Sequence, residues 1–200
     1  DIACGSFFSL ALKSDGTVVV WGAGTATQVP SSLTDVVAVA GGDKHILALK
    51  SDGTVVAWGD NDDGQTTVPA GLTDVTDIAS GFSHNLALKS DGTVVAWGRQ
   101  DKGQSDVPAG LTGVTAIAGG KYHSLALKSD GTVVAWGDNG LGQKDVPEGL
   151  TDVTAVAGAS SHGLALKSDG TVVAWGWNSY GQTDVPAGLT DVAAIAAGHN

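Results

Sequence analysis

The histidines are the residues whose type and spacing first suggest chemistry, because imidazole is a common metal ligand. All of them fall at one phase of a repeated motif: His45, His84, His123, His162 and His199, with Phe8 at that place in the first copy. Zinc needs its ligands to converge, with Zn–N distances near ~2 Å. Equivalent residues of stacked sheets are about 10 Å apart. We therefore predict structural histidines, each bonded to neighbouring backbone, and neither a metal nor a cofactor.

Two other motifs resemble functional sites and are better explained as turns. The segment Asp60-Asn-Asp-Asp-Gly-Gln lacks the alternating acidic spacing and the distal Glu of a calcium loop, and it recurs in related form at Asp138–Gln143. The five Ser-Asp-Gly tripeptides have no base beside them that could activate a serine. The sequence thus predicts no catalytic residues, and we expect a protein that is not an enzyme.

Binding chemistry is instead concentrated in two loops of each repeat. Apart from one Trp and one Lys in each repeat's framework, the aromatic and basic residues lie in or beside these variable loops. Tyr, Trp and Arg are the residues that most often anchor protein interfaces. We predict that another protein binds there, and the candidate contacts are Phe7, Phe8, Lys44, Phe82, Arg99, Lys102, Lys121, Tyr122, Trp177 and Tyr180.

A repeat positions these loops. The motif Leu-Ala-Leu-Lys-Ser-Asp-Gly-Thr-Val-Val starts at residues 10, 47, 86, 125 and 164, so the spacing is 37 residues once and then 39. Each copy predicts three strands: one like Val114–Gly119, then Leu-Ala-Leu-Lys, then Thr-Val-Val-x-Trp-Gly. The Asp-Gly between the last two is a strong hairpin signal. A small sheet cannot bury both of its faces alone, so neighbouring repeats must stack.

Radial stacking predicts an all-β fold, a β-propeller of five antiparallel blades of three to four strands, which either closes by itself or forms part of a larger ring or assembly. A parallel β-helix is the rival, but it does not require a hairpin in every unit. Both variable loops then open on one face of the ring. We place the repeats of this single domain at 1–35, 36–74, 75–113, 114–152 and 153–191, with 192–200 as a sixth inner strand near Ile195.

Composition narrows the classes of partner. Ten basic residues stand against 21 acidic ones, a formal net charge of −11. Nucleic acids and anionic membranes attract clustered positive charge, so we expect neither as a partner. The single Cys4 rules out an internal disulfide. The acidic, cysteine-poor composition favours a secreted or extracellular protein of bacterial origin.

The repeated residues resemble the regulator-of-chromosome-condensation repeat family, whose units carry Gly-x-x-His, Leu-Ala-Leu, Asp-Gly-x-Val, Trp-Gly and Gly-Gln. The segment Val133–Pro147 resembles most closely the short units of bacterial propeller-type β-lactamase inhibitory proteins. The resemblance implies a propeller and an inhibitor-like role. This chain departs from that pattern in having five units and in replacing the first Gly-Gln loop by Ala23-Gly-Thr-Ala-Thr-Gln.

Three functions fit the sequence. The first is a protein-binding scaffold, with a bacterial enzyme such as a β-lactamase as the partner that the resemblance implies. The second is a lectin or small-molecule binder, which would repeat its ligand contacts in every unit. The third is a structural or oligomerising protein that self-associates through the spare inner strand. The loop contents differ from unit to unit, which favours one asymmetric protein partner.

Overall fold

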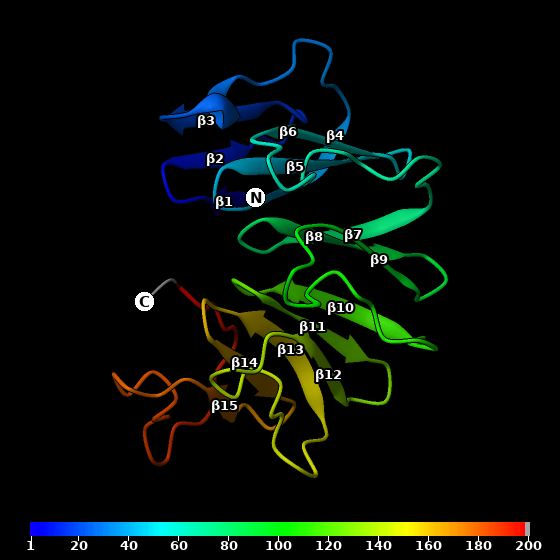
Figure 1. The fold of residues 1–200 in the computed structure, drawn as a ribbon. Helices are drawn as coiled ribbons and strands as arrows, with labels where there is room; N and C mark the ends of the chain where they lie inside the picture. Colours follow the sequence, from blue (N-terminus) through cyan, green and yellow to red (C-terminus); the bar gives the residue numbers. More distant parts are fainter. Residues whose placement is uncertain (199–200) are drawn as a thin grey trace.

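The predicted propeller of five three-stranded blades is confirmed by the computed structural model, which describes residues 1–198 (Figure 1). Within each blade the order is inner, middle and outer strand, all antiparallel. The inner strands are β1 (Ile2–Cys4), β4 (Val36–Gly41), β7 (Val75–Ser80), β10 (Val114–Gly119) and β13 (Val153–Gly158). The middle strands are β2 (Phe8–Leu12), β5 (His45–Lys50), β8 (His84–Lys89), β11 (His123–Lys128) and β14 (His162–Lys167). The outer strands are β3 (Val18–Gly22), β6 (Val55–Gly59), β9 (Val94–Gly98), β12 (Val133–Gly137) and β15 (Val172–Gly176).

One helical element interrupts this pattern in the described part of the chain, a single 3-10 turn η1 (Thr25–Thr27) that follows β3. Across residues 1–198 no helix has the length and the apolar character that crossing a membrane would need.

The Ser-Asp-Gly hairpins owe their shape to the residues on either side of the turn. In the second blade the Lys50 amide donates to the Thr54 carbonyl at 2.9 Å, and the Gly53 amide donates to the Lys50 carbonyl at 3.0 Å. Gly53 has φ 76, a left-handed conformation that glycine adopts without steric cost. The Asp52 carboxylate accepts the Thr54 amide at 3.0 Å and the Thr54 hydroxyl at 2.6 Å. Each middle and outer strand pair is therefore closed by local hydrogen bonds.

The hydrophobic core is divided among the interfaces between blades. Four clusters of buried side chains each join one blade to the next, and within residues 1–198 none joins the fifth blade to the first. Figure 1 shows the blades following one another from β1–β3 to β13–β15 as an arc. Stacking of like faces buries apolar area that a single three-stranded sheet would leave in water.

A tryptophan spans each of these four interfaces. Its indole Nε1 donates to a main-chain carbonyl in the loop of the preceding blade, and its ring is buried. The pairs are Trp58 to Ala26 at 2.8 Å, Trp97 to Gln65 at 3.1 Å, Trp136 to Gln104 at 2.9 Å and Trp175 to Gln143 at 2.9 Å. A buried indole needs such a partner, because an unpaired buried N–H group is costly.

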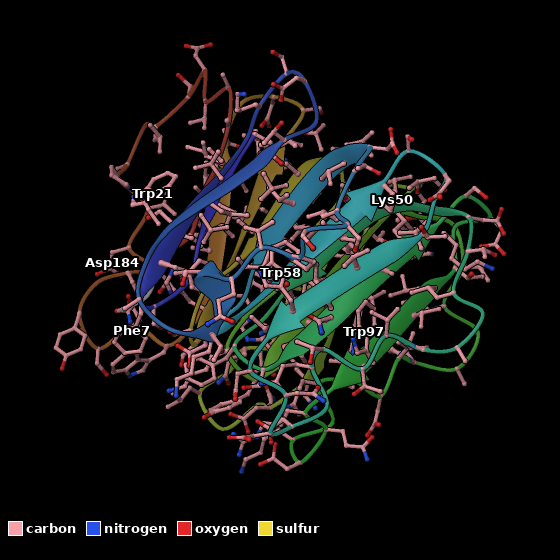
Figure 2. The ribbon with its side chains drawn as sticks, turned by 90° about the horizontal axis from the view of Figure 1, so that it is seen from above. Phe7, Trp21, Lys50, Trp58, Trp97 and Asp184 are labelled. Atoms are coloured by element: carbon pink, nitrogen blue, oxygen red, sulfur yellow. The ribbon has the colours of Figure 1, made fainter. Side chains whose placement is uncertain are left out.

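Trp21 is the one framework tryptophan that is not buried. Its exposed fraction is 54%, against 5% for Trp136, because within residues 1–198 no other blade packs against this side of the first blade. In Figure 2 Trp21 lies at the margin of the molecule, whereas Trp58 lies among the ribbons of the first two blades. Ile2 of the same blade is 82% exposed.

The expected sixth inner strand is also not formed. The amide of Val192 donates to the Gly170 carbonyl at 3.1 Å, as Val75 does to Gly53 at the start of β7. The segment therefore begins as an inner strand does, but within residues 1–198 no middle strand pairs with residues 192–198, and these residues are irregular. A strand needs a ladder partner for its backbone groups. His199 lies outside the described residues.

Trp136 is buried and Trp21 is exposed, so their replacement by alanine should change the free energy of unfolding by very different amounts. Trp136→Ala should lower the free energy of unfolding by roughly 3–5 kcal/mol, because it empties a core site and removes one of the two donors to the Gln104 carbonyl, leaving only the Ser124 hydroxyl. Trp21→Ala should lower it by less than about 1 kcal/mol. Urea denaturation of both variants checks this. Equal losses would contradict the open arc at the first blade.

Candidate functional site

The loops between inner and middle strands are tied to one another by main-chain hydrogen bonds between blades. The Ser6 amide donates to the Asp43 carbonyl at 3.0 Å, and the Asp43 amide donates to the Phe82 carbonyl at 3.0 Å. In the next blades the Phe82 amide donates to the Gly120 carbonyl at 3.3 Å, and the Lys121 amide donates to the Ala159 carbonyl at 3.1 Å. These bonds hold each variable loop in a set relation to the next, so side chains from different repeats meet in a defined arrangement.

The loops that follow the outer strands are held by a buried glutamine. In the second blade the Gln65 side chain accepts the Asp63 amide at 2.9 Å, and its Nε2 donates to the Asp60 carboxylate at 2.9 Å. Gln104 and Gln143 occupy the same place and are at most 2% exposed. The loop conformation is therefore fixed from inside while its outer positions remain free to vary. We call the surface made by the two sets of loops the loop face.

The structure brings four predicted contact residues together on the loop face between the third and fourth blades. Tyr122 lies with its ring centroid 6.2 Å from that of Phe82. The Arg99 guanidinium lies 5.3 Å from the Tyr122 centroid, and the Lys121 ammonium lies 5.2 Å from the centroids of both rings. These distances are within the range of cation–π attraction. We call these four residues the aromatic–basic cluster.

A salt bridge to Asp101 holds the Arg99 side chain of this cluster. Arg99 Nε donates to one carboxylate oxygen of Asp101 at 2.7 Å, and its Nη2 donates to the other oxygen at 2.8 Å. This bidentate contact lowers the pKa of Asp101 to about 2 and raises that of Arg99. Both groups are ionised at neutral pH, so the guanidinium is held in place over Tyr122.

Trp177 and Tyr180 form a second aromatic pair, in the loop of the fifth blade. Their ring centroids are 5.1 Å apart and the rings are nearly perpendicular at 78°. Tyr180 is 80% exposed, which is unusual for a large aromatic side chain. No ring contact joins this pair to the aromatic–basic cluster within residues 1–198.

The remaining predicted contacts are separate from both groups. Phe7, Phe8 and Lys44 surround a cavity between the first two blades. Phe7 is exposed, but Phe8 is 4% exposed and belongs to the core between these blades. Phe8 is therefore mainly a packing residue. Its place in the repeat, where the other blades have a buried histidine, could have indicated this. Lys102 is exposed, and within residues 1–198 its side chain forms no ion pair or cation–π contact with the cluster.

The four histidines among residues 1–198 are buried at the blade interfaces, as expected for structural residues, but their partners differ from the prediction. His45 Nε2 lies 2.6 Å from Asn85 Oδ1, and His84 Nε2 lies 2.9 Å from Ser124 Oγ. The partners are thus side chains of the next blade, where we expected backbone. The partner side chain makes a further hydrogen bond, in which Asn85 Nδ2 donates to the Gln65 carbonyl at 2.7 Å.

His123 has no such partner, because Gly163 occupies the position that Asn85 and Ser124 occupy in other blades. Both of its ring nitrogens are buried without a hydrogen bond among residues 1–198. Desolvation lowers the pKa of His123 to about 4 and that of His84 to about 3. In the described residues, no group of three His, Cys, Asp or Glu side chains is placed to hold a metal ion.

The axial end of the inner strands surrounds a further cavity of about 260 Å³. Most of the residues that line it are glycines and other small residues at equivalent positions of successive blades. A Cβ at Gly41 would lie 2.5 Å from the Cys4 carbonyl oxygen, which shows how closely neighbouring backbones approach here. The free Cys4 lies in this wall.

The repeat architecture coincides with a known family model. The regulator of chromosome condensation (RCC1) repeat matches residues 1–28, 36–65, 75–104, 114–143 and 153–182, one match to each blade. The chain belongs to the RCC1 repeat family. No curated protein matches the chain significantly.

Several solved structures share the fold of this RCC1-repeat chain. Prp20p from Saccharomyces cerevisiae is 21% identical with a TM-score of 0.85, and the match covers 100% of this chain and 66% of Prp20p. The ectodomain of the Arabidopsis thaliana receptor kinase ACR4 is 22% identical with a TM-score of 0.80, covering 99% and 73%. Human WBSCR16 is 23% identical with a TM-score of 0.76, covering 99% and 69%. The chain thus spans about two thirds of the length of these relatives.

The buried imidazoles predict a loss of stability in mild acid. A histidine whose pKa is lowered in the fold stabilises it above the unfolded value near ~6.5, and that stability is lost as the pH falls toward the folded value. Between pH 7 and pH 5, His123 alone should reduce the free energy of unfolding by about 2 kcal/mol. His123→Phe should flatten the profile by that amount, since Phe8 already occupies the equivalent position. Urea denaturation at several pH values measures both profiles, and parallel curves would contradict the burial of an uncharged His123.

Proposed function

We propose that this RCC1-repeat chain is a non-catalytic scaffold that binds another protein through its loop face. The observation that carries the proposal is the aromatic–basic cluster, in which Phe82, Arg99, Lys121 and Tyr122 come from three loops of two blades. Half-buried aromatic and arginine side chains on a rigid frame are typical anchors of protein interfaces.

The charge of the cluster suggests what the partner presents. The chain carries a formal charge of −11, yet two of its few cations outside the framework lie together over aromatic rings. Arg99 is already paired with Asp101, whereas no ion pair is formed by Lys121 within residues 1–198. An exposed apolar group flanked by a carboxylate on the partner would fit this arrangement.

Related propellers support a protein partner. The structure of Prp20p is described together with its binding to Gsp1p and histones, and yeast RCC1 (Prp20) has been seen bound to Kap60. These statements concern proteins of which this chain spans about two thirds or less, at 24% identity or below. They support a binding role for the fold, and they do not identify the partner of this chain.

A narrower version of the proposal names a secreted bacterial setting and an enzyme such as a β-lactamase as the target. It rests on the resemblance of Val133–Pro147 to the inhibitory propellers, and none of the reported relatives is such an inhibitor. A lectin would need equivalent sites in each blade. The described blades instead present the aromatic–basic cluster at one interface and the Trp177–Tyr180 pair in another loop, which favours one asymmetric partner.

Combined substitution of the loop face tests the proposal. A variant with Phe82, Arg99, Tyr122, Trp177 and Tyr180 all changed to alanine should keep its fold and lose partner binding by at least about 100-fold, because hot-spot residues contribute roughly 2 kcal/mol or more each. Proteins retained from the native source by the wild-type chain are identified by mass spectrometry, and their affinities are then measured with purified components.

The matched control changes the opposite end of the blades. Lys50, Lys89 and Lys128 lie beside the Ser-Asp-Gly hairpins, each within reach of an aspartate at the same turn. Their triple alanine variant should bind the partner as the wild type does. If the control variant loses binding and the loop-face variant keeps it, the proposed face is wrong.

A further inference from the structure

The interface between the first and second blades contains a cavity of about 300 Å³ that opens on the loop face. Phe7 and Phe8 line it from the first blade, together with the loop 23–26, and Asp43, Lys44 and Asp60 line it from the second. This volume lies at the lower end of the range found for ligand-binding pockets. It lies apart from the aromatic–basic cluster and shares no residue with it.

The cavity exists because the first blade lacks the glutamine that fills the equivalent place elsewhere. The Ala26 carbonyl accepts the Trp58 indole at 2.8 Å, as the Gln65 carbonyl accepts Trp97 at 3.1 Å, so Ala26 stands where Gln65 stands in the next blade. The Gln65 side chain is 1% exposed and occupies the interior of its loop. The first loop is also two residues shorter. Both changes remove atoms from one site.

The wall of the cavity carries a net negative charge. The Ser6 hydroxyl donates to one oxygen of the Asp43 carboxylate, and Asp43 is only 9% exposed. Gln65 Nε2 donates to one oxygen of Asp60 at 2.9 Å. Among residues 1–198 no donor reaches the second oxygen of either carboxylate, and the ammonium of Lys44 forms no ion pair. Two carboxylates and one ammonium leave a charge of −1.

We infer that this cavity receives the guanidinium side chain of an arginine from the partner protein, an inference that rests on the proposed function. Phe7 and Phe8 place aromatic rings in the cavity wall, and a guanidinium is attracted to aromatic rings, while Asp43 and Asp60 offer free acceptor oxygens. Arginine combines a planar cation with a long apolar stem and is weakly hydrated, so it enters such a site more readily than lysine.

The probe for this inference is the capped tripeptide acetyl-Gly-Arg-Gly-amide. Its citrulline analogue replaces the guanidinium by an uncharged urea of the same shape. The arginine peptide should bind with a dissociation constant on the order of 1 mM, as expected for one buried side chain. Amide shifts in ¹H–¹⁵N spectra should be confined to residues 7–8, 23–26, 43–44 and 60. The citrulline peptide should bind at least about tenfold more weakly.

Variants that change the charge of the cavity wall should change the affinity for the arginine peptide in opposite directions. Asp60→Asn should weaken the arginine peptide about tenfold, because a charged acceptor is lost. Lys44→Gln should strengthen it about threefold, because a like charge is removed from the cavity wall. Asp138→Asn is the matched control: Asp138 accepts Gln143 Nε2 at 3.2 Å in the fourth blade, as Asp60 accepts Gln65, and it should leave the affinity unchanged.

Several results would overturn the inference. Equal affinity of the arginine and citrulline peptides would show that charge plays no part. If Asp60→Asn strengthened binding of the peptide, the cavity would favour an anionic ligand. If Asp60→Asn and Asp138→Asn changed the affinity equally, the peptide would bind elsewhere. Binding of butylguanidine without binding of the tripeptide would indicate a free small cation in place of an arginine side chain. No partner protein is used, so failure here leaves the loop-face proposal to its own binding test.

Discussion

The hydrogen bond from a tryptophan indole to the main-chain carbonyl of the preceding blade is the contact on which the rest of the structure depends. It joins the outer strand of one blade to the outer loop of its neighbour, and the same distance of about 3 Å recurs at every interface of the arc. The contact uses a main-chain acceptor, so it survives the replacement of Gln65 by Ala26 in the first blade. The loops can therefore vary in sequence without loss of the frame.

Groups at both ends of the arc lack the partners that the equivalent groups have elsewhere. The first blade exposes Trp21, which has no preceding carbonyl, and the fifth blade leaves Gln182 Nε2 buried without a partner because Trp177 replaces the aspartate found at position 60. Three of the four interfaces add a second contact of their own, whereas at the fourth Gly163 leaves His123 without one. Ser124 and Asn85 receive a histidine, whereas Ile46 packs in the same core cluster as Phe8.

Much of the fold was predictable because its determinants are local and repeated. The Asp-Gly turns, the alternation of Leu-Ala-Leu and the constant Trp-Gly each act within a few residues, and five copies in one chain separate framework from variable positions. The repeat also predicts that variable loops share one face. It could not predict the exposure of Trp21 or the irregular path of residues 192–198, because burial and strand pairing depend on a neighbouring blade, not on the residue itself.

By itself, the sequence determined the propeller of three-stranded blades, the structural role of the buried histidines and the set of loop residues available for binding. Only the tertiary structure decided how those loop residues are grouped. Tyr122 meets Arg99 and Phe82 because adjacent blades bring separate loops within contact distance, whereas Trp177 and Tyr180 lie apart from them. Phe8 turns inward and Phe7 outward, although they are adjacent in the chain, because successive side chains at the start of a strand point in opposite directions. The cavity beside them forms because the loop after β3 is shorter and has Ala26 where the next blade has Gln65. The missing atoms leave a space because this loop packs against the second blade.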